Sequence, residues 1–132
     1  MGESVTALYS NNVLIVDNDK EFRDSLAKIF RKEGYRVIAA SDGNEASELV
    51  DEKMFALIVL DLKMPGKSGL ELLWEIKQKT PKSQVIIVTA FGEENSYLEA
   101  MQGGAFEFLN KPVKRKEILE SAKRALERVP IG

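Results

Sequence analysis

Polar side chains that can take part in chemistry stand after four short apolar runs of the sequence. Asp17 follows VLIV, Asp61 follows LIVL, Thr89 follows VIIV, and Lys111 stands two residues beyond FEFL. Clustered carboxylates repel one another and need a cation, and ligands that are all oxygen favour Mg²⁺ over softer metals. A carboxylate can attack a phosphoryl group, and a lysine and a hydroxyl can hold the oxygens of that group. We therefore expect a covalent aspartyl-phosphate site.

The apolar runs themselves have the character of β-strands. Residues 13–16, 57–60 and 85–88 are continuous apolar runs rich in β-branched side chains, which is typical of strands buried on both faces of a parallel sheet. Residues 36–40 and 106–109 are more mixed and suit strands at or near the edges of the sheet. Ligands of parallel α/β sheets bind at the carboxyl ends of the strands, so we expect the polar residues to meet at one edge.

Amphipathic segments alternate with these runs and predict five helices. Apolar side chains recur at helical spacing within residues 22–30, 46–50, 70–77, 97–101 and 118–126. Residues 41–43 are expected to cap the second helix, whereas Gly34, Pro81 and Gly103-Gly104 mark helix ends. Five strands that alternate with five helices indicate parallel βαβ units, and hence a doubly wound α/β fold with one five-stranded sheet.

Length and composition fit one globular domain. The chain has 132 residues, and its 19 basic and 21 acidic side chains give a formal net charge of -2. We expect one domain over residues 12–128, preceded by a flexible polar tail at residues 1–11 and followed by a linker or chain end at residues 129–132. Cysteine and histidine are both absent, which excludes thiolate chemistry and histidine bases or ligands. We expect a cytoplasmic protein without nucleic-acid binding, signal peptide or membrane span.

The motifs at the strand ends resemble the receiver domain of two-component response regulators, over essentially all of residues 12–128. The matching segments are IVDNDKEFR, LIVLDLKMPGKSGLELL, VIIVTAFG and GAFEFLNKPV, which occur in this order. The second half, with TAFG and then EAMQGGAFEFLNKPV, looks most like receivers attached to ATP-dependent transcriptional activators. The resemblance implies a flavodoxin-like fold with the strand order 2-1-3-4-5 and helices on both faces.

Carried over residue by residue, the resemblance makes Asp61 the phosphoryl acceptor. It places a Mg²⁺ ion on the carboxylates of Asp17 and Asp61 and on the backbone carbonyl of Lys63. The second acid of the family's metal pocket is Asn18 here, which can ligate Mg²⁺ through its amide oxygen but brings no negative charge. We expect weaker Mg²⁺ binding for this reason, because the next residue, Asp19, is expected to point elsewhere.

The resemblance also implies a switch that responds to phosphorylation. Thr89 matches the hydroxyl that moves toward the phosphoryl group, and Lys111 matches the lysine that holds one of its oxygens. Pro112 matches the proline that commonly follows a cis peptide bond, and Phe108 falls at the position of the switch aromatic residue. The surface made by the fourth helix, fifth strand and fifth helix would then control dimerisation or contact with an output domain or another protein.

The implied phosphoryl donor is a histidine kinase or phosphotransfer protein, since this chain contains no histidine. The domain would be a signalling protein rather than an enzyme, assisting only its own phosphorylation and dephosphorylation. One alternative is a degenerate receiver that binds partners without phosphorylation, which the asparagine at position 18 suggests. Another is a phosphatase of the haloacid dehalogenase type with Asp17 as nucleophile, but that class leaves Asp61 without a role.

Overall fold

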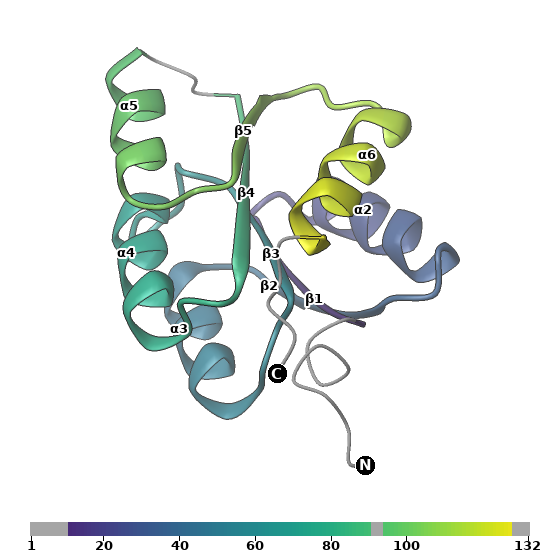
Figure 1. Cartoon of the computed structure of the whole chain (residues 1–132), viewed down its shortest axis with the longest axis horizontal. Coiled ribbons are helices and arrows are strands. Elements are labelled where there is room, and N and C mark those ends of the chain that lie inside the picture. The colour runs from purple at the N-terminus through teal and green to yellow at the C-terminus, as the bar shows by residue number, and fades with distance from the viewer. Residues whose placement is uncertain (1–10, 91–93, 128–132) are drawn as a thin grey trace.

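The computed structural model describes residues 11–90 and 94–127, which form a parallel β-sheet between two layers of helices (Figure 1). The strands are β1 (Asn12–Val16), β2 (Arg36–Ala40), β3 (Leu57–Leu60), β4 (Gln84–Thr89) and β5 (Glu107–Asn110). The helices are α2 (Lys20–Lys32), α3 (Gly43–Glu52), α4 (Gly69–Lys79), α5 (Glu94–Gln102) and α6 (Arg115–Leu126). The tail was expected at residues 1–11, of which residues 1–10 lie outside the described residues, as does the expected chain end at residues 129–132.

The five strands pair in parallel in the order β2-β1-β3-β4-β5, as predicted. The mixed runs form the two outer strands, β2 and β5, and the continuous apolar runs form the three inner ones. In register, Val16 of β1 lies opposite Leu60 of β3, and Leu60 lies opposite Ile87 of β4. The inner strands therefore end close together, at one edge of the sheet.

Two separate apolar cores explain why residues 13–16, 57–60 and 85–88 of the inner strands are all apolar. Leu14 and Val16 of β1 face the core beneath α3, α4 and α5, whereas Val13 and Ile15 face the core beneath α2 and α6. Figure 1 shows these two groups of helices on opposite sides of the sheet. Successive side chains of a strand point to opposite faces, so a strand covered on both faces needs apolar side chains throughout.

Polar side chains begin the helices that follow the strand ends. Asp19 caps α2, and its carboxylate accepts hydrogen bonds from the backbone N–H groups of Glu21 and Phe22. Asp42 caps α3 within the predicted segment 41–43. Ser68 caps α4 and forms a capping box with Glu71. These caps satisfy backbone groups that the first helical turn leaves unpaired, and they fix where each connecting loop ends.

The structure shifts the boundaries of three strands from their predicted positions. Strand β1 begins at Asn12 rather than at residue 13. Strand β4 runs over Gln84–Thr89 rather than residues 85–88, and β5 runs over Glu107–Asn110 rather than residues 106–109. Polar residues enter these strands because ladder hydrogen bonds use backbone groups, whatever the side chain. Within the described part of the chain, no helix combines the length and apolar character that crossing a bilayer requires.

Candidate functional site

Four polar side chains meet at the carboxyl edge of the sheet, where the sequence predicted them. Lys111 Nζ lies 2.8 Å from Asp17 Oδ2 and 3.1 Å from Asp61 Oδ2. Thr89 Oγ1 donates a hydrogen bond of 2.7 Å to Asp61 Oδ1. Both oxygens of Asp61 are therefore engaged, one by a hydroxyl and one by an ammonium group. Residues separated by up to 94 positions in the chain form one cluster.

Burial makes the charges in this cluster costly. Asp17 is 1% exposed, Asp61 5% and Thr89 0%, and only the Lys111 side chain reaches toward solvent. Two carboxylates share one ammonium group, so the cluster keeps an excess of one negative charge. A buried charge is stable only when it is paired and hydrogen-bonded, and this excess favours a further cation at the same place.

The Asp19 backbone and two side chains in the first turn of α2 complete the surroundings of Asp17 and Lys111. The backbone N–H of Asp19 donates to Asp17 Oδ1 at 2.8 Å, and Arg23 donates to the Asp17 backbone carbonyl at 2.7 Å. Lys111 Nζ lies 4.2 Å from the centre of the Phe22 ring, within reach of a cation–π interaction. Phe22 and Arg23 were not among the site residues expected from the sequence. Their place in the first turn of α2 was the available signal, because side chains there lean back over the preceding loop.

Burial and pairing shift the pKa values of two of these groups. Burial raises the pKa of the Asp17 carboxyl, and the hydrogen bonds from Lys111 and the Asp19 backbone offset this only in part. Burial works to lower the pKa of Lys111, but hydrogen bonds to Asp17 and Asp61 outweigh it, so that pKa is raised. Lys111 therefore remains protonated at neutral pH, and Asp17 is the group whose ionisation burial opposes.

The raised pKa of Asp17 predicts how stability responds to pH. A carboxyl group whose pKa is higher in the folded chain than in the unfolded one opposes folding once it ionises. This contribution should therefore lower the unfolding free energy as the pH rises above the ordinary aspartate pKa of 3.8. In metal-free buffer at pH 7, we expect Asp17→Asn to resist urea better than the wild type. The gain should exceed the roughly 0.5 kcal/mol scatter of surface substitutions and shrink toward pH 4.

The matched control for this experiment is Asp19→Asn, on the same turn. Asp19 is exposed, and an asparagine in its place can still cap α2. This variant should show no gain that depends on pH. A wild type that is more stable than Asp17→Asn at pH 7 would contradict the assignment of the burial cost to Asp17.

Residues that could supply oxygen ligands to a metal ion lie close to Asp17 and Asp61 in the chain. Asn18 is exposed and follows Asp17 in the chain, and the Lys63 backbone N–H donates to Asp61 Oδ1 at 3.3 Å. Among the described residues, no group of three or more Asp, Glu, His or Cys side chains is placed to bind a metal ion. Asp19 caps α2 instead, as expected. Two buried carboxylates, Asp17 and Asp61, suit a hard cation such as Mg²⁺, and they bring less negative charge than three acids would.

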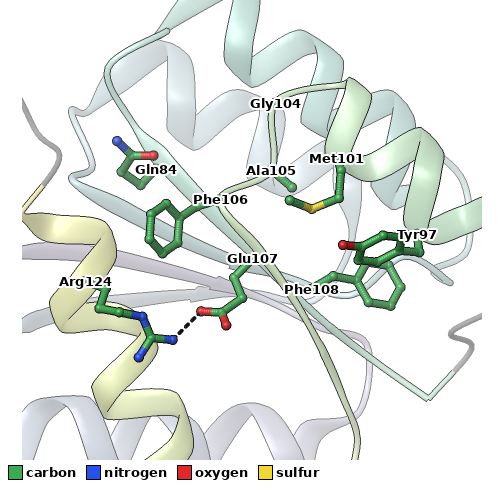
Figure 2. Close-up of a pocket in the computed structure, with 9 residues that line it drawn as sticks. All are labelled: Gln84, Tyr97, Met101, Gly104, Ala105, Phe106, Glu107, Phe108 and Arg124. Carbon is green, nitrogen blue, oxygen red and sulfur yellow. Dashed lines mark hydrogen bonds and ion pairs between the residues drawn. The ribbon is translucent and has the colours of Figure 1, made fainter.

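Phe108 lies on β5, away from the buried cluster. Its ring packs edge-on against Tyr97 of α5, with the ring centres 5.5 Å apart. Figure 2 shows both rings lining a hollow beside β5, with the Glu107–Arg124 ion pair of 2.7 Å on its other side. This hollow lies between α5, β5 and α6, which are the fourth helix, fifth strand and fifth helix of the fold. The peptide bond between Lys111 and Pro112, just after the carboxyl end of β5, is cis.

A family model described as the response regulator receiver domain matches residues 13–123. Protein PetR of Rhodobacter capsulatus is 37% identical over 119 residues, which are 90% of this chain and 50% of the relative. Sporulation initiation phosphotransferase F of Bacillus subtilis is 34% identical over 119 residues, covering 90% of this chain and 96% of the relative. The chain thus spans half the length of one relative and nearly all of the other.

Solved structures share the fold at similar levels of identity. The beryllofluoride-activated NtrC4 receiver domain dimer matches with a TM-score of 0.86 and 35% identity, over 91% of this chain and 99% of that chain. NtrC4 is one of the NtrC-like activators among the matches, so the expected similarity to receivers of such activators is confirmed. The matched family is not the phosphatase class, and that alternative gains no support from these comparisons.

Proposed function

This chain belongs to the response regulator receiver domain family, and on that premise we propose that Asp61 accepts the phosphoryl group. One observation carries the proposal: both carboxylate oxygens of Asp61 have a donor, Thr89 on one side and Lys111 on the other. Such donors suit the oxygens of an incoming phosphoryl group as well as the carboxylate itself. Asp17, the other buried acid, shares Lys111 and is left to bind a metal ion.

The proposed reaction is a transfer from a phosphohistidine of a histidine kinase or phosphotransfer protein. An oxygen of Asp61 attacks the phosphorus atom, and the bond between phosphorus and the histidine nitrogen breaks. The nitrogen leaves with the electron pair and takes up a proton, and Asp61 becomes an acyl phosphate. Lys111 and Thr89 then donate to phosphoryl oxygens, which stabilises the charge that gathers on them.

A Mg²⁺ ion would be held by oxygens of this chain. We assign the carboxylates of Asp17 and Asp61, the amide oxygen of Asn18 and the backbone carbonyl of Lys63 to this role. When bound, the ion offsets negative charge on the transferring oxygens. An amide at position 18 in place of a carboxylate gives weaker attraction for the ion, so this domain should need more Mg²⁺ than one with a third acid.

The output of phosphorylation would be a change on the face formed by α5, β5 and α6. Thr89 is bonded to Asp61, and Phe108 lies two positions before Asn110, the residue opposite Thr89 in the sheet. We assign Thr89 and Phe108 to a joint shift that biases this face toward an output domain, another protein or a second copy of the chain. The NtrC4 receiver is described as a dimer, which supports the last possibility. The domain would act in the cytoplasm, and would catalyse only its own phosphorylation and dephosphorylation.

Intact mass tests the proposal directly. We expect the wild type to gain the mass of one phosphoryl group during incubation with acetyl phosphate and Mg²⁺, because the small phosphodonor replaces the kinase while the site does the chemistry. An excess of EDTA should prevent the gain. No gain from a folded protein would favour the degenerate receiver instead, and Asn18→Asp would then be the variant that shows whether the missing acid is the cause.

A further inference from the structure

Side chains outside the site hold the loop that follows Asp61. This loop, residues 62–68, joins β3 to α4 and contains Lys63. The ammonium group of Lys67, near its end, forms an ion pair with Glu75 of α4 and donates to Ser47 Oγ of α3 at 3.3 Å. Ser47 also donates to the Glu75 carboxylate. We call Ser47, Lys67 and Glu75 the Glu75 cluster; it ties the loop to two helices at once.

The Glu75 cluster is shielded and permanently charged. The Lys67 and Glu75 side chains are only 27% and 18% exposed. Burial works to raise the pKa of Glu75, but hydrogen bonds from Lys67, Ser47 and Lys79 lower it to about 2. Salt screens partly buried ion pairs less than surface pairs. Because Glu75 stays ionised, its ion pair with Lys67 persists at every physiological pH.

Backbone contacts hold the same loop against α3 and α4. At Gly43, the first residue of α3, an added Cβ would lie 2.6 Å from the backbone oxygen of Lys67, so the two backbones are in direct contact. The Gly69 N–H donates to the Leu62 carbonyl at 2.9 Å and closes the loop at its base. Lys63 thus lies between two fixed points, Asp61 at the end of β3 and Lys67 against the two helices.

We propose that the Glu75 cluster positions the loop so that the Lys63 carbonyl is ready for the metal ion, and thereby sets the Mg²⁺ affinity and phosphorylation rate of Asp61. The inference rests on the function proposed above for Asp61 and Lys63. The three residues of the Glu75 cluster act on the metal site only through the loop, so they are positioning residues. Ordering a loop costs conformational entropy. When the loop is already held in place, metal binding does not have to overcome this cost, and the affinity for the ion is higher.

The test compares Lys67→Met with Lys79→Met in the full chain. Methionine keeps the aliphatic length of lysine and removes the charge. Lys79 also bonds Glu75, at 2.9 Å, but its other partner is Asp51 of α3, and it has no bond to the loop. For Lys67→Met we expect the Mg²⁺ concentration at half-maximal phosphorylation by acetyl phosphate to rise about three- to tenfold. Lys79→Met should stay within about twofold of the wild type.

A second measurement needs neither metal nor phosphoryl donor. Hydrogen exchange of the Gly69 amide in metal-free protein reports how often the loop opens, because that amide bonds across the base of the loop. It should exchange several-fold faster in Lys67→Met than in Lys79→Met. Ser47→Ala, which removes one bond without removing a charge, should raise the exchange rate in the same direction by less. The double variant Lys67→Glu with Glu75→Lys should restore much of the protection and of the Mg²⁺ affinity.

The two measurements separate this inference from the proposed function. If the wild type is phosphorylated and Lys67→Met matches Lys79→Met in Mg²⁺ requirement, the inference is wrong and the function stands. If Gly69 exchanges at the same rate in both variants, the cluster does not hold the loop and the inference is again wrong. If the wild type gains no phosphoryl group at any Mg²⁺ concentration, the proposed function fails, and the metal part of the inference fails with it.

Discussion

Replacing Asp61 with asparagine is expected to abolish the Mg²⁺-dependent gain of one phosphoryl group in intact mass. The substitution keeps the shape of the side chain but exchanges a carboxylate for an amide, whose oxygen is a far weaker nucleophile. In the wild type, Thr89 and Lys111 donate hydrogen bonds to the Asp61 carboxylate. In the variant these donors face an amide group instead. We expect the rate of phosphorylation to fall by at least about 100-fold, which intact mass over time can measure.

Asp19→Asn provides the matched control for this result. Asp19 also lies at the carboxyl edge of the sheet, two residues after Asp17, but it is exposed and caps α2. Asparagine caps a helix about as well as aspartate, so this variant should be phosphorylated at the wild-type rate. If Asp61→Asn gained the phosphoryl group as fast as Asp19→Asn, another residue would be the acceptor, and the buried Asp17 would be the next one to replace.

The fold and the cluster could be predicted from the sequence because both depend on strong local signals. The apolar runs at residues 57–60 and 85–88 are too short for helices and too apolar for a surface, so they had to be buried strands. Once the strands were parallel, the residues just after them had to share an edge. Asp61, Thr89 and Lys111 follow from that geometry alone. Their chemical types then suggested the reaction.

The contacts that tune the site could not be predicted in the same way. The pairing of Lys67 with Glu75 depends on how α4 starts after the loop, and Ser47 comes from another helix altogether. Arg23 reaches the Asp17 carbonyl because the helix starts where Asp19, rather than a neighbour, caps α2. A shift of one residue in either helix start would turn these side chains by about 100°. Sequence patterns locate helix ends less accurately than that.

Gly69→Ala is the substitution expected to damage the fold most near the site. Gly69 is buried and begins α4, and a Cβ built on it would lie 2.3 Å from the Asp61 backbone oxygen and 2.5 Å from Leu62 Cα. Alanine normally favours a helix over glycine by up to about 1 kcal/mol. Overpacking against rigid backbone costs about 1–3 kcal/mol or more, and here no flexible side chain can move aside. The clash should therefore outweigh the gain.

We expect the unfolding free energy of Gly69→Ala in urea to fall by about 2 kcal/mol. Its phosphorylation rate should fall as well, because relief of the clash must move the backbone of Asp61 or Leu62.

Gly34→Ala is the control that separates the effect of this clash from the effect of backbone strain. Gly34 has a φ of +96°, but an added Cβ there meets nothing within 4 Å. Alanine at position 34 should lower the unfolding free energy by about 1–2 kcal/mol through backbone strain, and the less flexible unfolded chain offsets part of this loss. Gly34 lies before β2, at the opposite end of the strands from Asp61. The variant should therefore lose stability while keeping the wild-type phosphorylation rate. Equal loss of phosphorylation in both variants would mean that global stability, rather than the contact between Gly69 and Asp61, limits the reaction.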